Sequence, residues 1–253
     1  MKRTLRIAAV AGAVAIVVAA GLTTHESDPV RAGRSGKGHD IVIANGNDRL
    51  PNTTASDWIT YADHVVAVTP VAESEIPPTP EEVERGEGMI LRNVQLRVDD
   101  VVWSKAAPGR PAPTAFDWVA YGWSFQGPDT SQRVKMAGED EPRLEAGHSY
   151  LMAIEWQEPR CSPGDEPVPG QWRGLGEDST VPFDGQVIGD GELEGKPQSA
   201  AELLATQGIE EPDLSLEDEM TGKDAAALDH ALDTAPPQTE EQFGPDPAET
   251  ACK

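Results

Sequence analysis

"MILRNVQLRVDDVVW", residues 89–103, is the stretch that decides the fold. Its side chains alternate between two faces of an extended chain. The apolar face carries Ile90, Val94, Leu96, Val98 and Val102, and the polar face carries Asn93, Gln95, Arg97 and Asp99. Strict alternation of apolar and polar residues is typical of a β-strand that buries one face of its sheet and exposes the other to solvent. We therefore predict a strand here and a fold built from sheets.

Three further segments are rich in β-branched and aromatic residues and also predict strands. They are "DWITYADHVVAVTPVAE" at 57–73, "TAFDWVAYGWSF" at 114–125 and "HSYLMAIEWQ" at 148–157. Pro70 lies near the end of the first of them, and it predicts a sheet edge or a bulge at that point. The chain thus offers several strands that are separated by long loops.

One short helix is predicted between the first two strands. Thr79 has the chemistry of an N-cap, Pro80 suits the first helical position, and Glu82 completes a capping box. Gly86 is the expected stop signal. No long helix is predicted between strands, so the pattern favours an all-β fold over residues 58–195. We expect a small OB-like barrel of five to six strands, or a sandwich.

The N-terminus predicts export. "MKRTLR" is basic, and residues 7–22 follow without a charge, which is the pattern of a secretory signal. The apolar run of about 16 residues would reach roughly 24 Å as a helix, short of the ~30 Å hydrocarbon core. Its length favours a cleaved signal peptide over residues 1–22, with a single-span plasma-membrane anchor as the alternative. Either form places the rest of the chain outside the cytoplasm.

The regions on both sides of the strands look different from the centre. Residues 23–57 look polar and aperiodic, so we expect a flexible linker, in which residues 40–47 could add one short strand. Residues 196–208 predict a short helix with a Ser199–Glu202 capping box. Residues 209–253 are acidic and Pro-rich, which predicts a disordered tail. Within that tail, residues 223–232 have the pattern of one weak helix.

The charge of the chain limits its partners. The formal net charge is -24, from 44 acidic and 20 basic residues. Nucleic acids and anionic lipids need Lys and Arg to replace their counterions, so neither is expected to bind. We predict an envelope protein or a cell-wall glycan as the partner. Contact with a membrane is expected only through an uncleaved N-terminal segment.

No catalytic signature stands out. Ser124 and Ser149 miss the G-x-S-x-G pattern, and neither H-E-x-x-H nor C-x-x-C occurs. We therefore predict no catalytic, metal or cofactor residues, and a binding or structural module rather than an enzyme. The alternative is a secreted hydrolase with a site assembled across loops near His64 and His148. The neighbouring Asp63 would point away from His64 on an ideal strand.

The chain has two cysteines, Cys161 and Cys252. In an exported protein an even pair can form a disulfide, and closing a loop of about 90 residues would contribute roughly 4–5 kcal/mol in the chain-entropy model. The alternatives are two unpaired thiols or pairing between chains.

The aromatic residues of 114–125 divide between two faces. Phe116 and Trp118 alternate onto one, and Tyr121, Trp123 and Phe125 onto the other. One set should be core. The second set, Tyr121, Trp123 and Phe125, is either covered by loops or the tail as part of the core, or forms a contact surface that stacks on sugar rings or on apolar residues of a partner.

A resemblance follows from the strand patterns in "ADHVVAVTPVAE", "LRNVQLRVDDVVWSK" and "LEAGHSYLMAIEW". These patterns resemble uncharacterised exported bacterial proteins of an actinobacterial kind and, more remotely, netrin-like and other extracellular OB-fold modules. The resemblance covers roughly residues 60–157. It implies an extracellular β-barrel, and it assigns no functional residues.

Overall fold

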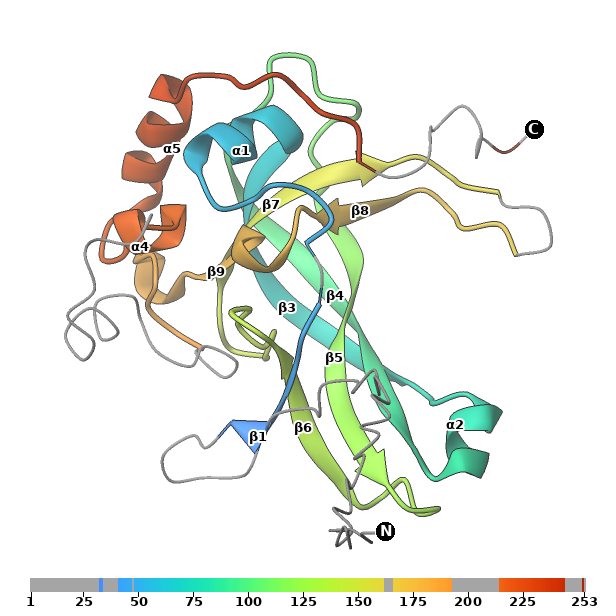
Figure 1. The fold of residues 1–253 in the computed structure, drawn as a ribbon. Coiled ribbons are helices and arrows are strands. Elements are labelled where there is room, and N and C mark those ends of the chain that lie inside the picture. Colours follow the sequence, from blue (N-terminus) through green and yellow to red (C-terminus); the bar gives the residue numbers. More distant parts are fainter. Residues whose placement is uncertain are drawn as a thin grey trace, which may run out of the picture.

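The computed structural model describes residues 32–33, 41–46, 48–161, 166–192, 214–243 and 252. One open, mixed sheet of nine strands dominates it (Figure 1). The strands run in the order β1-β2-β6-β5-β4-β3-β7-β8, and β9 also pairs with β7. Their bounds are β1 Ala32–Gly33, β2 Ile41–Ala44, β3 His64–Ile76, β4 Glu87–Ser104, β5 Ala115–Gln126, β6 Arg133–Gly138, β7 Tyr150–Gln157, β8 Gln171–Gly174 and β9 Thr180–Pro182.

The predicted predominance of strands is confirmed, and the strand over residues 89–103 is the long β4. It pairs with β3 on one side and β5 on the other, both antiparallel. The predicted short helix is α2, Pro80–Arg85, with Thr79 and Glu82 in a capping box and Gly86 left-handed at its end. Figure 1 shows α2 at the tip where β3 turns into β4. A register shift falls between Pro70 and Ala72, where Pro70 predicted a bulge.

The first predicted strand begins too early. Residues Ala55–Tyr61 form the helix α1, and β3 starts only at His64. Thr54 accepts a hydrogen bond from the backbone N–H of Asp57, and the Asp57 carboxylate accepts one from the N–H of Thr54. This capping box stabilises the helix although Trp58, Ile59 and Tyr61 favour strands by propensity.

Residues 41–46 and 48–57 of the predicted linker pack against the sheet, and the short strand that the sequence allowed there is β2. β2 pairs in parallel with β6, a strand that lies within the loop expected between residues 126 and 147. Leu50 and Asn52 are buried, and the backbone N–H of Leu50 donates to the carbonyl of Leu175 at 2.9 Å. The parallel β2–β6 pair makes the sheet mixed.

The described part of the predicted disordered tail is also ordered. It contains α4, Leu216–Met220, and α5, Ala225–Thr234. Their apolar residues Leu216, Met220, Leu228 and Leu232 are buried. Composition predicts disorder when a segment has too little apolar surface to bury, but here a few leucines are placed on one face and meet the sheet. The helix predicted over 196–208 and the signal at 1–22 lie outside the described residues.

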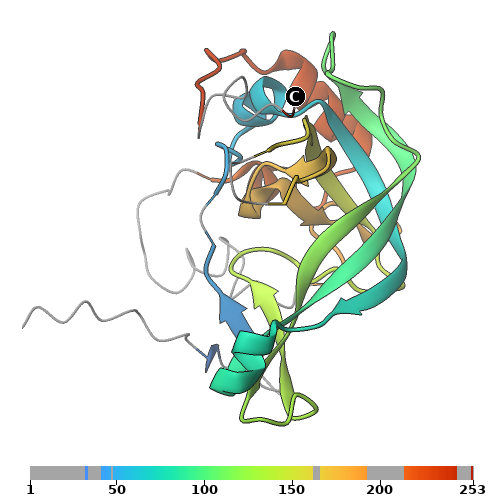
Figure 2. The same cartoon turned by 90° about the vertical axis from the view of Figure 1, so that its right-hand side faces the viewer.

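The sheet has two differently covered faces. On the helix face, α1, α4 and α5 cover a cluster that includes Trp58, Val65, Leu151 and Leu228. The opposite face, which we call the cavity face, buries Val66, Leu96, Phe116, Met152 and Trp172. β3 and β7 contribute side chains to both clusters, which is why residues 64–68 of β3 and 150–154 of β7 are buried on both sides. Figure 2 shows the long strands curving around the smaller elements.

Two short 3-10 turns complete the fold. They are η1, Glu177–Ser179, and η2, Asp184–Gln186. η1 follows β8 and lies against β7. Ser179 caps this region through its hydroxyl, which accepts from the N–H groups of Leu175 and Gly176 at 3.1 Å. The loop between β8 and β9 is thereby fixed beside the cavity face.

Candidate functional site

A bulge in β5 rearranges the aromatic residues on which the predicted contact surface rests. Ile90 pairs with Trp123 and Leu91 pairs with Tyr121, so Gly122 is the extra residue. Such a bulge switches the alternation of the strand. A Cβ at Gly122 would collide with the carbonyl oxygen of Ile90, so this position requires glycine.

The switch places Trp123 and Phe125 on the same face as Phe116 and Trp118. Their partners show this, because Phe116, Trp118, Trp123 and Phe125 pair with Leu96, Val94, Ile90 and Gly88, which share one face of β4. Phe125 is 2% exposed, and Trp123 lies beneath two guanidinium groups, those of Arg133 at 4.1 Å and Arg143 at 5.4 Å from its ring centre. Phe125 is therefore a core residue, and a contact surface that includes the half-buried Tyr121 and Trp123 stays a prediction.

Two buried arginines meet at the bulge. Arg143 donates through Nη1 to the carbonyls of Tyr121 at 3.1 Å, Gly122 at 2.8 Å and Met136. Its Nε donates to Glu145 at 2.5 Å. Arg92 donates through Nε to the same Tyr121 carbonyl at 2.9 Å. Because a bulge leaves ladder carbonyls without strand partners, the arginines complete the hydrogen bonding that the sheet lacks there.

Arg92 is only partly satisfied. Its Nη1 donates to Glu73 at 2.7 Å, but its buried Nη2 has no hydrogen-bond partner among the described residues. The Arg92 side chain is 1% exposed, whereas that of Glu73 is 50% exposed. Solvent weakens the influence of the exposed carboxylate, so a desolvated positive charge remains on the cavity face.

Both arginines line one cavity of about 360 Å³, which we call the arginine cavity. It lies where β8 passes over β5, next to β6. Its wall includes Arg92, Arg143, Trp118, Tyr121, Trp172 and Glu177. Arg92 and Arg143 are the fully buried basic residues of the described chain. In a protein with a formal net charge of -24, this is a distinctive concentration of positive charge.

Aromatic rings form another part of the wall. Trp118 packs so closely against Gly174 of β8 that a Cβ at Gly174 would lie 3.0 Å from the indole ring. Trp172 stacks at an angle against His64 and Trp156, with ring centres 5.5 and 5.4 Å apart. The rings are therefore held in place by neighbouring strands, which suits a preformed binding wall.

Carboxylates line the cavity beside the arginines. Burial raises the pKa of Glu177, and the negative charges of Asp48, Glu139 and Asp140 add to this shift. Burial also raises the pKa of Tyr121, with further contributions from Glu141 and Glu177. Close to Arg143, by contrast, the pKa of Glu145 is lowered. Burial alone would raise the pKa of Glu145, but the hydrogen bond and charge of Arg143, followed by the charges of Arg92 and Lys135, lower it.

His64 is buried and fully bonded. It is 2% exposed, its Nδ1 lies 2.8 Å from the Ser104 hydroxyl, and its Nε2 donates to the Arg110 carbonyl at 2.8 Å. The neighbouring Asp63 points elsewhere, accepting from the N–H groups of Gly109 and Trp156 at 2.9 Å. Both residues thus fix the loop after β4 to the sheet.

His148 belongs to a different region. Its Nδ1 lies 2.5 Å from Asp184, whose other oxygen accepts from the Ser149 N–H at 2.8 Å. His64 pairs with Ile154 on β7, six residues from His148, so the two histidines are about 20 Å apart along the strand. The structure does not bring together the two residues on which the hydrolase alternative depends.

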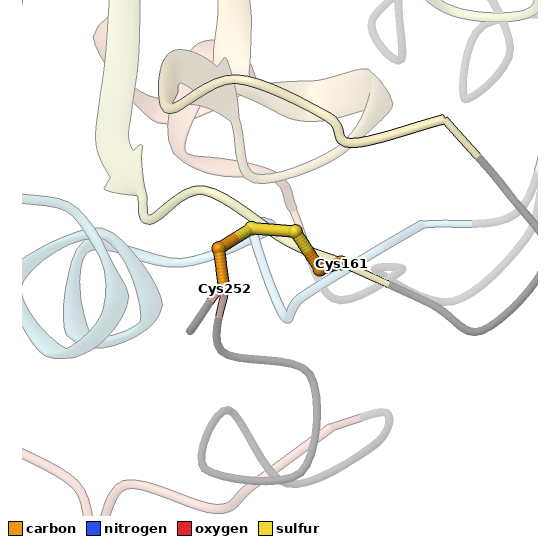
Figure 3. Close-up of a disulfide and its surroundings, with 2 residues drawn as sticks. All are labelled: Cys161 and Cys252. Atoms are coloured by element: carbon orange, nitrogen blue, oxygen red, sulfur yellow. A yellow bond between two sulfur atoms is a disulfide. The ribbon is translucent and has the colours of Figure 1, made fainter.

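The structure joins Cys161 to Cys252 by a disulfide, with Cα atoms 5.0 Å apart (Figure 3). Cys161 follows β7, so this bond fixes the C-terminal end of the chain beside the sheet. Upstream of it, the backbone N–H of Gln238 donates to the Thr60 hydroxyl and that of Glu241 to the Tyr61 hydroxyl, both at 3.2 Å.

Two features are absent from the described residues, a membrane-spanning helix and a metal-binding cluster. No helix there is both long and apolar enough to cross a bilayer. Within the same ranges, no group of three or more His, Cys, Asp and Glu side chains is placed to hold a metal ion.

Arg92 is the site residue that the sequence analysis missed. It occupies the even-numbered, apolar face of β4 between Ile90 and Val94. A basic residue in an otherwise apolar stripe is the signal that would have identified it. Gly122, inside a predicted strand, was the corresponding signal for the bulge.

The comparisons with known proteins identify no relative. No family model matches the chain, and no curated protein or solved structure matches it either.

Proposed function

We propose that the protein is an exported, non-enzymatic binding module of the cell envelope, and that its arginine cavity holds a saccharide. The observation that carries this proposal is the combination of fixed aromatic rings and charged planar groups in one cavity. The apolar faces of sugar rings pack on aromatic side chains, while guanidinium and carboxylate groups hydrogen-bond to hydroxyls in pairs. The cavity of about 360 Å³ lies within the usual range for small ligands.

The binding interpretation is favoured over the hydrolase because His64 and His148 lie at different ends of the β3–β7 pair. His64 also uses both of its nitrogens in contacts with Ser104 and Arg110. An extracytoplasmic location is supported by the N-terminal sequence and by the disulfide, since disulfides persist in oxidising compartments.

We further propose that the sheet is a partly open barrel of the OB type. Its antiparallel core runs β5-β4-β3-β7, and β8 returns to lie against β5. OB folds bind oligosaccharides on one face of such a sheet, which is an analogy at the level of the fold. The resemblance to exported bacterial and netrin-like proteins supports the same proposal.

The test is calorimetric titration of the secreted protein with two soluble probes, an N-acetylglucosamine tetramer and a galacturonic acid trimer. We expect saturable binding of at least one. Trp118→Ala should weaken it at least about tenfold, because the variant removes one aromatic wall.

The matched control is Trp103→Ala. Trp103 is half-buried like Trp118, but it packs against the helix-face cluster. We expect this variant to bind like the wild type. The proposal fails if neither probe binds, or if the two variants lose affinity equally.

A further inference from the structure

The arginine cavity lies between the edges of two strands. Side chains alternate between the two faces of a strand, so a cavity that touches one face is lined by every second residue. This cavity is lined instead by consecutive residues of both strands that border it, 117–121 of β5 and 171–174 of β8. Both strands therefore turn their edges, with the backbone N–H and C=O groups, toward the cavity.

The edge of β5 has backbone groups without a strand partner. β6 pairs with β5 only at residues 123–125, so among the described residues the earlier part of β5 has no hydrogen-bonded strand on that side. The N–H of Val98 donates to the Thr114 carbonyl at 2.9 Å, which continues the β4–β5 register by one residue. Because hydrogen-bonded and non-hydrogen-bonded pairs alternate along an antiparallel ladder, Asp117 and Val119 point their backbone groups away from β4, toward the cavity.

The edge of β8 presents such groups from the other side. On β7, the N–H of Trp156 donates to Asp63 at 2.9 Å, so it points toward β3 rather than β8. Trp172 lies directly opposite Trp156 in a pair that is not hydrogen-bonded, and its own N–H and C=O therefore point away from β7. Gly174, two residues further on, points the same way, and its carbonyl accepts from Arg49 at 2.7 Å. The backbone groups of Trp172 thus face the cavity opposite β5.

A secondary amide matches two facing strand edges. Its carbonyl and its N–H point in opposite directions, as in the peptide groups of a middle strand, which bond to a neighbour on each side. A whole added strand would need about 9–10 Å between its two neighbours along its length, whereas Cα atoms of β5 and β8 come within 8 Å of each other. A single amide needs that width at one point only, so a ligand with an isolated amide suits the cavity better than an extended peptide.

Positive charge beside β5 sets the direction of that amide. Arg92 and Arg143 both donate to the Tyr121 carbonyl, at 2.9 and 3.1 Å, so their guanidinium groups lie next to the β5 edge. A hydrogen-bond acceptor is attracted there, and a donor is repelled. The amide oxygen of the ligand thus points to β5, where Val119 offers its N–H, and the amide N–H points to β8, where the Trp172 carbonyl accepts.

We infer that the saccharide held by the arginine cavity is N-acetylated, and that its acetamido group lies between the β5 and β8 edges with the acetyl oxygen on the N–H of Val119. This inference rests on the proposed function, because it specifies the class of saccharide that the cavity holds. It makes the backbone of β5 the element that distinguishes N-acetylated sugars from sugars with a hydroxyl in the same place.

The test compares two probes that share their ring and linkage, the N-acetylglucosamine tetramer and cellotetraose. They differ in the substituent at ring carbon 2, which is an acetamido group in the first and a hydroxyl in the second. In calorimetric titration, the wild-type protein should bind the N-acetylated tetramer roughly fivefold to thirtyfold more tightly, which is the range for one or two neutral hydrogen bonds. We call this ratio of affinities the acetamido preference.

Val119→Pro removes the N–H that is proposed to bind the ligand. It keeps the hydrogen bonds between β4 and β5, because the N–H of Val119 does not take part in that ladder, and proline is tolerated at such edge positions. The acetamido preference should fall by about fivefold, toward one. Val119→Ala changes the side chain but keeps the N–H, so it should keep the acetamido preference.

Ala115→Pro is the matched control for the proline substitution. Ala115 points its N–H away from β4 in the same way, since it is two residues before Asp117, but it does not line the cavity. This variant should bind both tetramers like the wild type. Circular dichroism at the titration temperature verifies that each variant is folded, and the wild-type comparison of the two tetramers needs no variant.

The outcomes separate the inference from the proposed function. Equal binding of the two tetramers by the wild type overturns the acetamido inference and leaves saccharide binding intact. Binding of neither tetramer, nor of the galacturonic acid trimer, overturns both. An undiminished acetamido preference in folded Val119→Pro overturns the placement at the β5 edge. If a blocked pentapeptide of alternating threonine and valine binds more tightly than the N-acetylated tetramer, the cavity is a docking edge for strands, and the inference is wrong.

Discussion

The two faces of the β3–β7 pair are covered in different ways. Val65 and Ala67 point to the helix face, and Val66 and Val68 point to the cavity face. The helix face is sealed by α1, α4 and α5, whose buried contacts are almost entirely apolar. The cavity face combines an apolar cluster with a cavity that is lined by two buried arginines. Helix-covered apolar packing and buried positive charge thus lie on opposite sides of the same strands.

Hydrogen bonding shows the same contrast. On the helix face, the indole N–H of Trp58 donates to the Asn52 carbonyl at 2.7 Å, and Asn52 donates to the Leu50 carbonyl at 2.8 Å. These polar groups are satisfied within a few residues. On the cavity face, Arg92 keeps an unpartnered nitrogen. Buried side-chain nitrogens are usually hydrogen-bonded in native proteins, so this nitrogen distinguishes the cavity face from the helix face.

The largest expected effect is on the helix face. Leu228 of α5 is 2% exposed and packs in the helix-face cluster. Leu228→Ala removes buried methyl groups and leaves a cavity, which should cost about 2–5 kcal/mol of unfolding free energy. Urea unfolding followed by circular dichroism measures it. The affinity of the folded variant for the saccharide probes should equal that of the wild type, and a loss below about 0.5 kcal/mol would show that α5 is not docked as described.

The disulfide should have the next largest effect. Cys252→Ser removes a cross-link between residues 91 positions apart, and we expect a loss of about 2–4 kcal/mol. Urea unfolding of wild type with and without reductant provides the comparison. Reductant should lower the stability of the wild type to that of the variant, and it should leave the variant unchanged. A wild type that is insensitive to reductant would contradict the intrachain bond.

The smallest effect concerns the charge cluster beside the cavity. Glu145 has a folded-state pKa below its ordinary value of 4.5, because Arg143, Arg92 and Lys135 outweigh the opposing effect of burial. Its ionised form therefore stabilises the fold above that ordinary value, and this contribution is lost as the pH falls through the lowered pKa.

Glu145→Gln should consequently lower the melting temperature by roughly 2–4 °C at pH 7, and the difference from the wild type should shrink as the pH falls through the lowered pKa of Glu145. Glu87→Gln is the control, because Glu87 and Arg85 form an exposed pair that contributes little. A pH-independent difference for Glu145→Gln would mean that its side chain acts through packing rather than charge.

The same contrast explains how much of the molecule could be predicted from the sequence. β4 and α2 were predictable because their signals are local: alternation along residues 89–103, and the cap formed by Thr79 and Glu82. A local signal also existed for α1, where Thr54 and Asp57 form a capping box, but the strand propensity of Trp58 and Tyr61 masked it.

The rest depends on contacts between distant segments. The parallel β2–β6 pair and the docking of α4 and α5 join parts of the chain that composition describes as linker and tail. The bulge at Gly122 changes which aromatics share a face, and alternation alone cannot reveal where it falls. The cavity follows from that bulge, because Arg92 and Arg143 converge on the Tyr121 carbonyl.

The most direct test of the central claim is to map the binding site of the N-acetylglucosamine tetramer by NMR chemical-shift perturbation on the isotope-labelled protein. The two-face account predicts that the perturbed signals cluster at the cavity, in residues 117–122, 137–144 and 171–177 and in the indole N–H of Trp118 and Trp172. Signals of α5 should stay unchanged. Saturable perturbations centred on α5 and the helix face, with the cavity signals unmoved, would contradict it.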